Sequence, residues 1–308
     1  SFDAFLEAQP RLAARTRTFA RMMVQGFDAA DPARASARAI AEEWGGGEMG
    51  ASQPRPAGGY GALLGWLGAS VEPRLLRLRL QHVVRQVRWS AGKVQLSGEF
   101  LGRPFSVRAR QAIVTLPLGV LQSRAVRFSP ALGAKRAALR ALASGPVVKI
   151  ALRFDLSFWE ARHRDIGFFH NPAAPFPTFW TQLPARAPLL IGWAGGPKAE
   201  ALRGLDADAI ARKALGSLEA TLGRNAAAES RLQNVHVQDW QRDPYAAGAY
   251  SYVLTAGGGA REALAAPVGD TLFFAGEATD AAGNAGTVAG ALQSGIRAAR
   301  ELLCARPR

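Results

Sequence analysis

The segment over residues 271–303, TLFFAGEATDAAGNAGTVAGALQSGIRAARELL, constrains the fold more than any other part of the chain. Residues 271–275 are mostly apolar and predict a buried strand. Gly276 then allows a tight turn, and Glu277 follows at the carboxyl end of the strand. A loop of small residues leads into a helix that we predict over residues 286–303. The sequence therefore predicts a strand–loop–helix unit with a carboxylate at the carboxyl end of the strand.

The first turn of that helix has the chemistry of a binding site for a flat ligand. Its residues, Thr287, Val288, Ala289 and Gly290, are small enough for a ligand to approach the backbone closely. A helix N-terminus offers unpaired N–H donors and the positive end of the helix dipole. Such donors suit the electron-rich carbonyl edge of a flavin. A plain strand–loop–helix unit, with small residues that serve packing, explains the same pattern, and these residues alone leave both explanations open.

The remaining chain predicts a mixed α/β fold, because helical and strand periods alternate along its 308 residues. Hydrophobic residues make up 48% of the sequence, enough for a sizeable core. Asp31 and Pro32 have the residue types of a helix N-cap and first turn. The other predicted helices cover residues 60–67, 130–143 and 206–222. The predicted strands cover residues 75–80, 83–89, 93–99, 106–116, 147–154, 167–170, 178–182, 189–194 and 233–241.

The net charge of +14 invites a nucleic-acid partner, but the distribution of charge argues against one. Only five of the 38 basic residues are lysines, the arginines are spread along the chain, and no five basic residues are consecutive. A basic nucleic-acid-binding protein therefore stands as a minor alternative. No apolar run is long enough to cross a bilayer, so we expect a soluble protein without a membrane partner. The single cysteine, Cys304, fits a reducing compartment, and we expect a cytoplasmic location. The scattered histidines predict no metal site.

The run FFAGEATD followed by GTVAGALQSGIRAA closely resembles the C-terminal flavin motif of the flavin-containing amine oxidase family. That family includes monoamine oxidases, polyamine oxidases and lysine-specific histone demethylases. The resemblance implies FAD as the cofactor. It implies that Glu277 contacts the ribityl or pyrophosphate region, that Gly276 forms part of the same turn, and that the Val288 backbone N–H faces the flavin O2.

Other segments follow the family order. PAGGYGALLGWL, over residues 56–67, is similar to the family's turn and helix at the flavin edge, which places Gly58 and Gly59 among the cofactor contacts. LQHVVRQVRWSAGKVQL, over residues 80–96, resembles a strand pair in which the backbone of one valine, here Val84, meets the adenine. An ordinary glycine turn and an ordinary hairpin would explain these two segments equally well if each stood alone.

Three residues carry the catalytic expectations that the resemblance implies. In GPVVKIALRFDLSFW, Lys149 matches a lysine bonded through water to flavin N5; the alternative is an outward-facing lysine. In QDWQRDPYAAGAYSYV, Tyr250 matches one wall of an aromatic cage for the amine; the alternative is a core tyrosine. Thr287 stands where monoamine oxidases carry the second cage tyrosine. Ala249 replaces the cysteine that bonds flavin in monoamine oxidases, so we expect non-covalent FAD.

The family opens with an apolar strand, a GxGxxG turn and a helix that bind the FAD pyrophosphate. The only match to that spacing here is the run GGGEMG over residues 45–50. It follows no apolar strand and precedes no helix, so we reject it. Because the chain also starts at a predicted helix without Met, we expect a fragment or processed product covering the C-terminal two-thirds of an amine oxidase. A partner chain that carries the GxGxxG unit is one way to complete it.

The sequence as a whole predicts a partial FAD-binding domain joined to an amine-oxidase substrate domain with a mixed sheet and helices. We expect substrate-domain helices in residues 1–55, the middle part of the FAD-binding domain in 56–125, the substrate domain in 126–267, and the C-terminal part of the FAD-binding domain in 268–308. The implied activity is oxidative deamination of a small-molecule amine with hydride transfer to FAD. A non-catalytic fragment and a split enzyme remain alternatives, and the sequence leaves the identity of the amine and the oligomeric state open.

Overall fold

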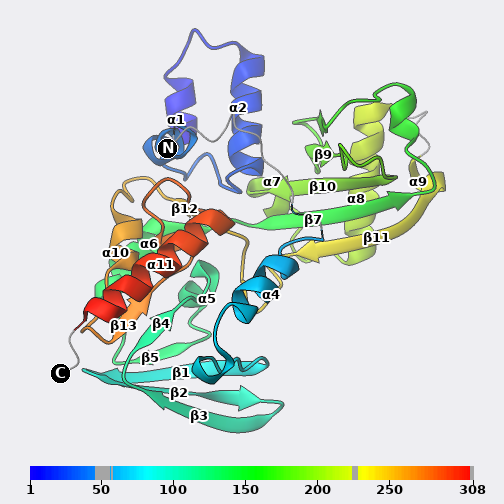
Figure 1. Cartoon of the computed structure of the whole chain (residues 1–308). Helices are drawn as coiled ribbons and strands as arrows, with labels where there is room; N and C mark the ends of the chain where they lie inside the picture. Colours follow the sequence, from blue (N-terminus) through cyan, green and yellow to red (C-terminus); the bar gives the residue numbers. More distant parts are fainter. Residues whose placement is uncertain (46–55, 57, 224–227, 306–308) are drawn as a thin grey trace.

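The computed structural model describes residues 1–45, 56, 58–223 and 228–305 (Figure 1). Most of the rejected glycine run at 45–50 therefore lies outside the described residues. Three groups of elements are visible in Figure 1: the N-terminal helices, a five-stranded sheet with a long helix, and a part that combines residues 82–129 with residues 272–304. No helix of the described part is both long and apolar enough to cross a membrane.

The five-stranded sheet is antiparallel and has the order β11-β7-β10-β9-β8. Its bounds are β7 (Val147–Phe154), β8 (Phe168–His170), β9 (Thr178–Trp180), β10 (Leu189–Gly195) and β11 (Leu232–Asp239). Buried residues of β7, such as Ile150 and Leu152, form one core cluster with Ile210 and Leu218 of α8 (Ala207–Leu222). Asp206 caps α8, because its Oδ1 accepts from Ala209 N at 2.7 Å. The predictions for β7 and α8 are confirmed.

A four-stranded sheet, in the order β3-β2-β1-β5, is made of β1 (His82–Ser90), β2 (Lys93–Phe100), β3 (Arg103–Ala109) and β5 (Arg127–Ser129). The predicted hairpin of β1 and β2 is confirmed. Beside it, β4 (Ala112–Val114) pairs in parallel with β13 (Leu272–Phe274), which joins segments about 160 residues apart in sequence. The helix α11 (Val288–Cys304) follows β13, and Thr287 is its N-cap rather than its first helical residue.

The N-terminal helices are α1 (Phe2–Glu7), α2 (Ala14–Gly26) and α3 (Ala37–Gly45). The expectation that Asp31 caps a helix starting at Pro32 is wrong. Asp31 Oδ1 instead accepts from Ala33 N in a tight turn, and α3 begins only after Ser36, whose Oγ accepts from Ala39 N at 3.3 Å. The turn ends at Ala35 because that residue forms a β-bridge with Leu254.

Three further predictions need correction. Residues 75–80 form no strand: after the 3-10 turn Pro73–Leu75 the chain has no strand partner among the described residues, and Leu75 (75%), Leu78 (73%) and Leu80 (70%) are exposed. The predicted strand over residues 106–116 is two strands, β3 and β4, in different sheets. The predicted helix over 130–143 is shorter, α6 (Arg136–Ala141), because β6 (Leu142–Ser144) pairs with β12 (Ser251–Val253).

The remaining elements are short connections. They are α4 (Gly61–Ala69), which confirms the helix predicted over 60–67, α5 (Leu118–Ser123), η2 (Gly133–Lys135), η3 (Phe158–Ala161), α7 (Pro197–Glu200), α9 (Ala228–Arg231), α10 (Ala260–Ala265) and η5 (Glu277–Thr279).

Candidate active site

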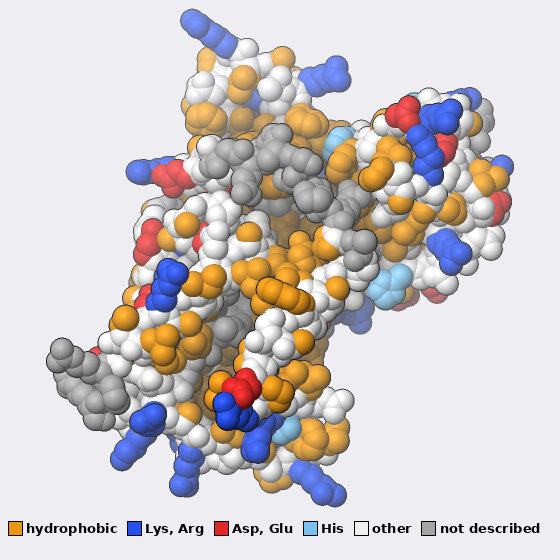
Figure 2. Space-filling model, viewed as in Figure 1, with side chains coloured by type: hydrophobic (Ala, Val, Ile, Leu, Met, Phe, Trp, Pro, Cys, Tyr) orange, Lys and Arg blue, Asp and Glu red, His pale blue; other side chains and the backbone are white. Residues whose placement is uncertain are grey.

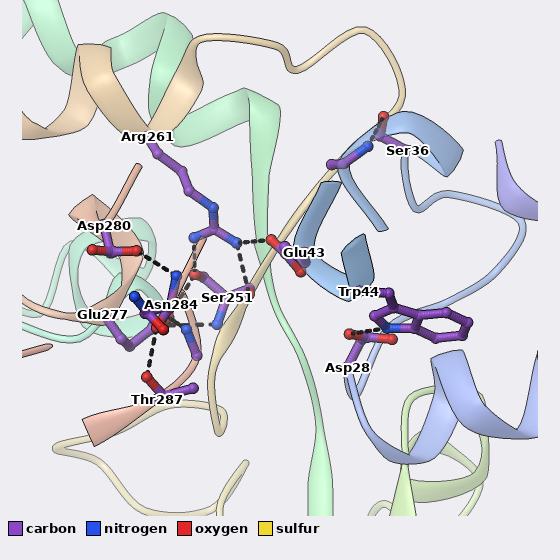
Figure 3. Close-up of polar contacts among 12 residues, drawn as sticks. Asp28, Ser36, Glu43, Trp44, Ser251, Arg261, Glu277, Asp280, Asn284 and Thr287 are labelled. Atoms are coloured by element: carbon purple, nitrogen blue, oxygen red, sulfur yellow. Dashed lines mark hydrogen bonds and ion pairs between the residues drawn. The ribbon is translucent and has the colours of Figure 1, made fainter. Parts of the chain in front are cut away.

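Glu277 lies where β13 ends and is held by three hydrogen bonds. Its Oε2 accepts from Ser251 Oγ at 2.7 Å and from Gly286 N at 2.9 Å, and its Oε1 accepts from Ser251 N at 3.2 Å. The strand β12, the turn after β13 and the loop before α11 therefore meet at this carboxylate (Figure 3). The sequence predicted Glu277 at the carboxyl end of the strand, and the structure also brings its carboxylate to the loop before α11.

Arg261, which the sequence analysis missed, extends this network. Its side chain is buried, and its Nη1 donates to Ser251 Oγ at 2.6 Å. Its Nη2 donates to Glu43 Oε1 at 3.0 Å and to the Ser251 carbonyl at 3.2 Å. Burial raises the pKa of the Glu43 carboxyl, and the charge of Arg261 opposes that rise. Figure 3 shows Arg261 between Glu43 and Ser251, so α3, α10 and β12 are tied to the same cluster.

The start of α11 offers unpaired backbone donors, as the sequence predicted. The Thr287 hydroxyl donates to Asn284 O at 2.6 Å and accepts from Gly290 N at 3.0 Å. No acceptor among the described residues is found for the N–H of Val288, whose side chain is exposed. A β-carbon on Gly290 would lie 2.1 Å from Asn284 O, so the loop packs directly on the first turn of the helix and requires glycine there.

Tyr250 lies against the same loop. A β-carbon on Gly286, which has φ +72°, would stand 3.3 Å from the Tyr250 ring. The Tyr250 hydroxyl donates to Phe27 O at 2.6 Å, and Gly26 O lies 3.4 Å away. Burial raises the pKa of the Tyr250 hydroxyl, and the charges of Asp28 and Glu277 add to this rise. One face of the loop before α11 is therefore covered by an aromatic ring in a fixed position.

Lys149 lies in the middle of β7, opposite Trp193 of β10 and Gln238 of β11. Its Nζ is 5.9 Å from the centre of the Trp180 ring. The Trp193 indole N–H donates to Gly26 O at 2.8 Å, the carbonyl that also lies near the Tyr250 hydroxyl. The end of α2 thus connects the β7–β10 pair around Lys149 with Tyr250.

At the other expected cofactor residues the backbone is accessible to a ligand. Gly58 and Gly59 both have φ +77°, at an exposed turn before α4, and Gly276 has φ +120°. Val84 is on β1 next to a bulge, where the register with β2 shifts between Val84 and Gln86. Since β5 pairs with β1 only from Gln86 onward, no described strand covers the Val84 backbone on that side.

A cavity of ≈ 140 Å³ lies beside the Glu277 network. Its lining includes Glu43, Gly258, Arg261, Asp280 and Gly283. One oxygen of Asp280 is engaged locally, because its Oδ2 accepts from Asn284 N at 2.8 Å and from Ala282 N at 3.2 Å. The charged walls and glycine backbone of this cavity suit a polar part of a ligand rather than an apolar one.

Residues 1–303 match the model of the family described as flavin containing amine oxidoreductase, and the chain belongs to that family. Its members are flavin-dependent oxidoreductases, so FAD is the expected cofactor. The residues described here fit such a group: a helix start with free N–H donors, glycine backbone that a ligand can approach, and an open strand edge at Val84.

Among curated relatives, the chain is 30% identical over 236 residues to "Lysine-specific histone demethylase 1B" of Mus musculus and to "Lysine-specific histone demethylase 2" of Homo sapiens. Each comparison covers 74% of this chain, and the chain spans 28% of each relative. In fold, it is similar to a cyclohexylamine oxidase from Brevibacterium oxydans, with TM-score 0.76 and 22% identity over 97% of this chain and 66% of that one. A putrescine oxidase variant gives TM-score 0.82 and 21% identity, over 98% of this chain and 67% of that one.

Proposed function

We propose that this chain supplies the substrate-binding part and most of the flavin-contacting part of an FAD-dependent amine oxidase. The observation that carries the proposal is the meeting of Glu277, the free helix start at Val288 and the Tyr250 ring around one loop. When bound, FAD supplies the acceptor for a hydride equivalent from the amine carbon and passes the electrons to O2, giving H2O2. The oxidised amine hydrolyses to a carbonyl product and an amine or ammonia.

The residues of the chain have distinct roles in this proposal. The Val288 N–H would hold the flavin carbonyl edge, and the positive end of the α11 dipole would favour negative charge there. Glu277 and Gly276 hold the ribityl or pyrophosphate region, and the Val84 backbone meets the adenine. Gly58 and Gly59 let the chain pass close to the flavin edge. These roles are supported by the fixed carboxylate, the open strand edge and the positive φ angles described above.

Three side chains would act on the amine and on water. The Tyr250 ring orients the amine against the flavin face, and its hydrogen bond to Phe27 O keeps the ring in place. Thr287 leaves the opposite side of the site open, because a threonine is much smaller than a second tyrosine. Lys149 holds a water at the reacting end. Because Ala249 offers no thiol, FAD is held without a covalent bond.

We further propose that a GxGxxG strand–helix unit completes the cofactor site, within a longer polypeptide or from a partner chain. In this proposal, residues 56–125 and 268–308 belong to one cofactor-binding part, and residues 1–55 and 126–267 to the substrate part; the parallel pairing of β4 with β13 supports the first grouping. Large apolar side chains of α4 and the following segment, including Leu64, Trp66 and Leu78, are exposed. Figure 2 shows hydrophobic side chains gathered over α4, the kind of surface that an added unit would cover. The single, free Cys304 supports the cytoplasmic location that we propose.

The test is to purify the chain alone and together with the GxGxxG unit of a family relative, add FAD, desalt, and record the visible spectrum. The samples are then screened for peroxide with cyclohexylamine, putrescine and a methylated lysine peptide. Flavin retention and amine-dependent peroxide, lost in Lys149→Met but not in Lys213→Met on α8, support the proposal. Flavin that is not retained even with the added unit, or peroxide that is independent of amine, contradicts it.

A further inference from the structure

Asp28 is a buried carboxylate that lacks a full set of partners. It lies just after α2, and only 7% of its surface is exposed. Its Oδ1 accepts from the Trp44 indole N–H at 3.3 Å (Figure 3), whereas its Oδ2 has no hydrogen-bond partner among the described residues. Buried carboxylates are normally paired, because an unpaired one loses its hydration without compensation. The energetic cost of this unpaired oxygen points to a function for Asp28 beyond packing.

The groups that face Asp28 are acidic or neutral. Glu43 from α3 and Tyr250 from the segment before β12 both interact with it electrostatically, and Trp44 is neutral. Arg261, the cation bonded to Glu43, is already engaged by Glu43 and Ser251. Burial, together with the charge of Glu43, raises the pKa of the Asp28 carboxyl to about 8, and the Trp44 bond opposes this rise. These surroundings favour the protonated form of Asp28, and a positively charged donor at Oδ2 is the group that would stabilise its ionised form.

The position of Asp28 connects it with the proposed substrate wall. Gly26 and Phe27 come directly before Asp28 in sequence. The Tyr250 hydroxyl donates to the Phe27 carbonyl and lies close to the Gly26 carbonyl. Gly26 O also accepts from Trp193, which is paired with Lys149 across β7 and β10. The backbone of Gly26 and Phe27 therefore contacts both Tyr250 and the strand pair that carries Lys149. Asp28 is the next residue in sequence after this segment.

We propose that Asp28 binds the ammonium group of the substrate through Oδ2 and takes one of its protons. The N–H bond breaks, its electron pair stays on nitrogen, and the proton forms an O–H bond with Asp28, which yields a neutral amine and a carboxylic acid. A buried site favours this neutral pair, because desolvation penalises both charges of the ion pair. The neutral amine has the lone pair that oxidation at the adjacent carbon requires. The proton later leaves to water. This inference rests on the proposed function.

The first test measures binding of cyclohexylamine to the full chain by calorimetry between pH 6 and 10, without turnover. Asp28→Asn keeps the shape of the protonated carboxyl and removes the acceptor charge, so we expect binding about tenfold weaker or more at about pH 9, where the wild-type carboxyl has lost its proton and the amine still carries one. Asp208→Asn, an exposed aspartate on α8, makes the same chemical change and should bind like the wild type. Circular dichroism melts confirm folding, and Asp28→Ser serves as a smaller second variant. Equal binding by the wild type and both Asp28 variants overturns the proposal.

The second test measures flavin reduction by the amine in the FAD-loaded protein as a function of pH. Asp28→Asn should lower the rate most at about pH 9, where the wild-type carboxyl is ionised and the amine is still protonated, and approach the wild-type rate at higher pH, where free amine is already neutral. A loss that is the same at every pH contradicts proton transfer. If the wild type oxidises amines and Asp28→Asn matches it throughout, this inference fails and the proposed function stands. If cyclohexylamine binding depends on Asp28 but no flavin is reduced, the proposed function fails and the cation site stands.

Discussion

The Tyr250 hydroxyl donates a hydrogen bond of 2.6 Å to the carbonyl of Phe27, a residue 223 positions earlier in the sequence. This bond joins the end of α2 to the segment before β12, and the Tyr250 ring stands against Gly286 in the loop before α11. The N-terminal helices, the strand β12 and the start of α11 therefore meet at one side chain. The candidate site depends on this junction.

Removing only the hydroxyl tests the junction. Tyr250→Phe keeps the ring but loses the bond to Phe27 O, and we expect a loss of about 1 kcal/mol in stability and a higher KM for the amine. Thermal unfolding and peroxide assays measure the two effects. Tyr245→Phe, at an exposed tyrosine of the same loop region, is the matched control and should change neither. A Tyr250→Phe protein indistinguishable from that control would show that the bond does not position the ring.

Arg261 is the cation on which the Glu43–Ser251–Glu277 cluster depends. Arg261→Met leaves the half-buried Glu43 without its ion-pair partner, and the expected loss is about 2–3 kcal/mol in urea unfolding. Adding Glu43→Gln should recover part of that loss, because it removes the unpaired charge. The control Arg38→Met breaks an exposed pair with Glu42 and should have little effect. Equal effects of the two arginine variants would contradict this account.

Asp28 should make stability depend on pH. Its pKa is 3.8 in the unfolded chain and about 8 in the folded one, so the folded state holds a proton that the unfolded state releases over this range. The stability that this proton contributes is present below about pH 4 and is lost as pH rises toward about 8, by up to about 1.4 kcal/mol per pH unit. Chemical denaturation at several pH values measures the slope. In Asp28→Asn the slope should become shallower; an unchanged slope would assign it to other groups.

The contact between α11 and its preceding loop admits no side chain at Gly290. Gly290→Ala would place a β-carbon 2.1 Å from Asn284 O, so the loop must shift, at a cost of about 1–3 kcal/mol, and we expect weaker FAD retention. Gly295→Ala, in the same helix, meets nothing within 4 Å and should stabilise the protein by about 0.5–1 kcal/mol without affecting FAD. Retention of FAD by Gly290→Ala at the wild-type level would show that the loop position is unimportant for binding.

Short-range sequence patterns correctly predicted the helices and strands that are specified within a single segment. The period of two in β7 and the Asp206 cap of α8 lie within single segments, and the turn between β1 and β2 needs only Gly92 at φ +66°. The prediction of a strand over residues 75–80 failed because alternation specifies a strand only when a partner strand is present. The sequence contains no local signal for that partner.

The residues of the candidate site also fall into two groups: those predicted from one local segment and those placed by long-range packing. Glu277, Val288 and Thr287 belong to one continuous segment, so their proximity follows from the strand–loop–helix pattern. Asp28 and Arg261 gave no signal in the sequence, since an aspartate after a helix and an arginine in the first turn of another are usually solvated. Their burial depends on contacts between distant segments, such as Arg261 with Glu43, 218 residues apart. Long-range packing of this kind cannot be seen in a single sequence.

The most direct test of the central claim is anaerobic reduction of bound flavin by an amine. The chain, completed with a GxGxxG unit and loaded with FAD, is mixed with cyclohexylamine or putrescine without oxygen, and the visible spectrum is followed. The account predicts that the oxidised flavin bands disappear and return when oxygen is admitted, with release of H2O2. Bound flavin that stays oxidised with every amine tested would contradict the assignment of this chain as part of an amine oxidase.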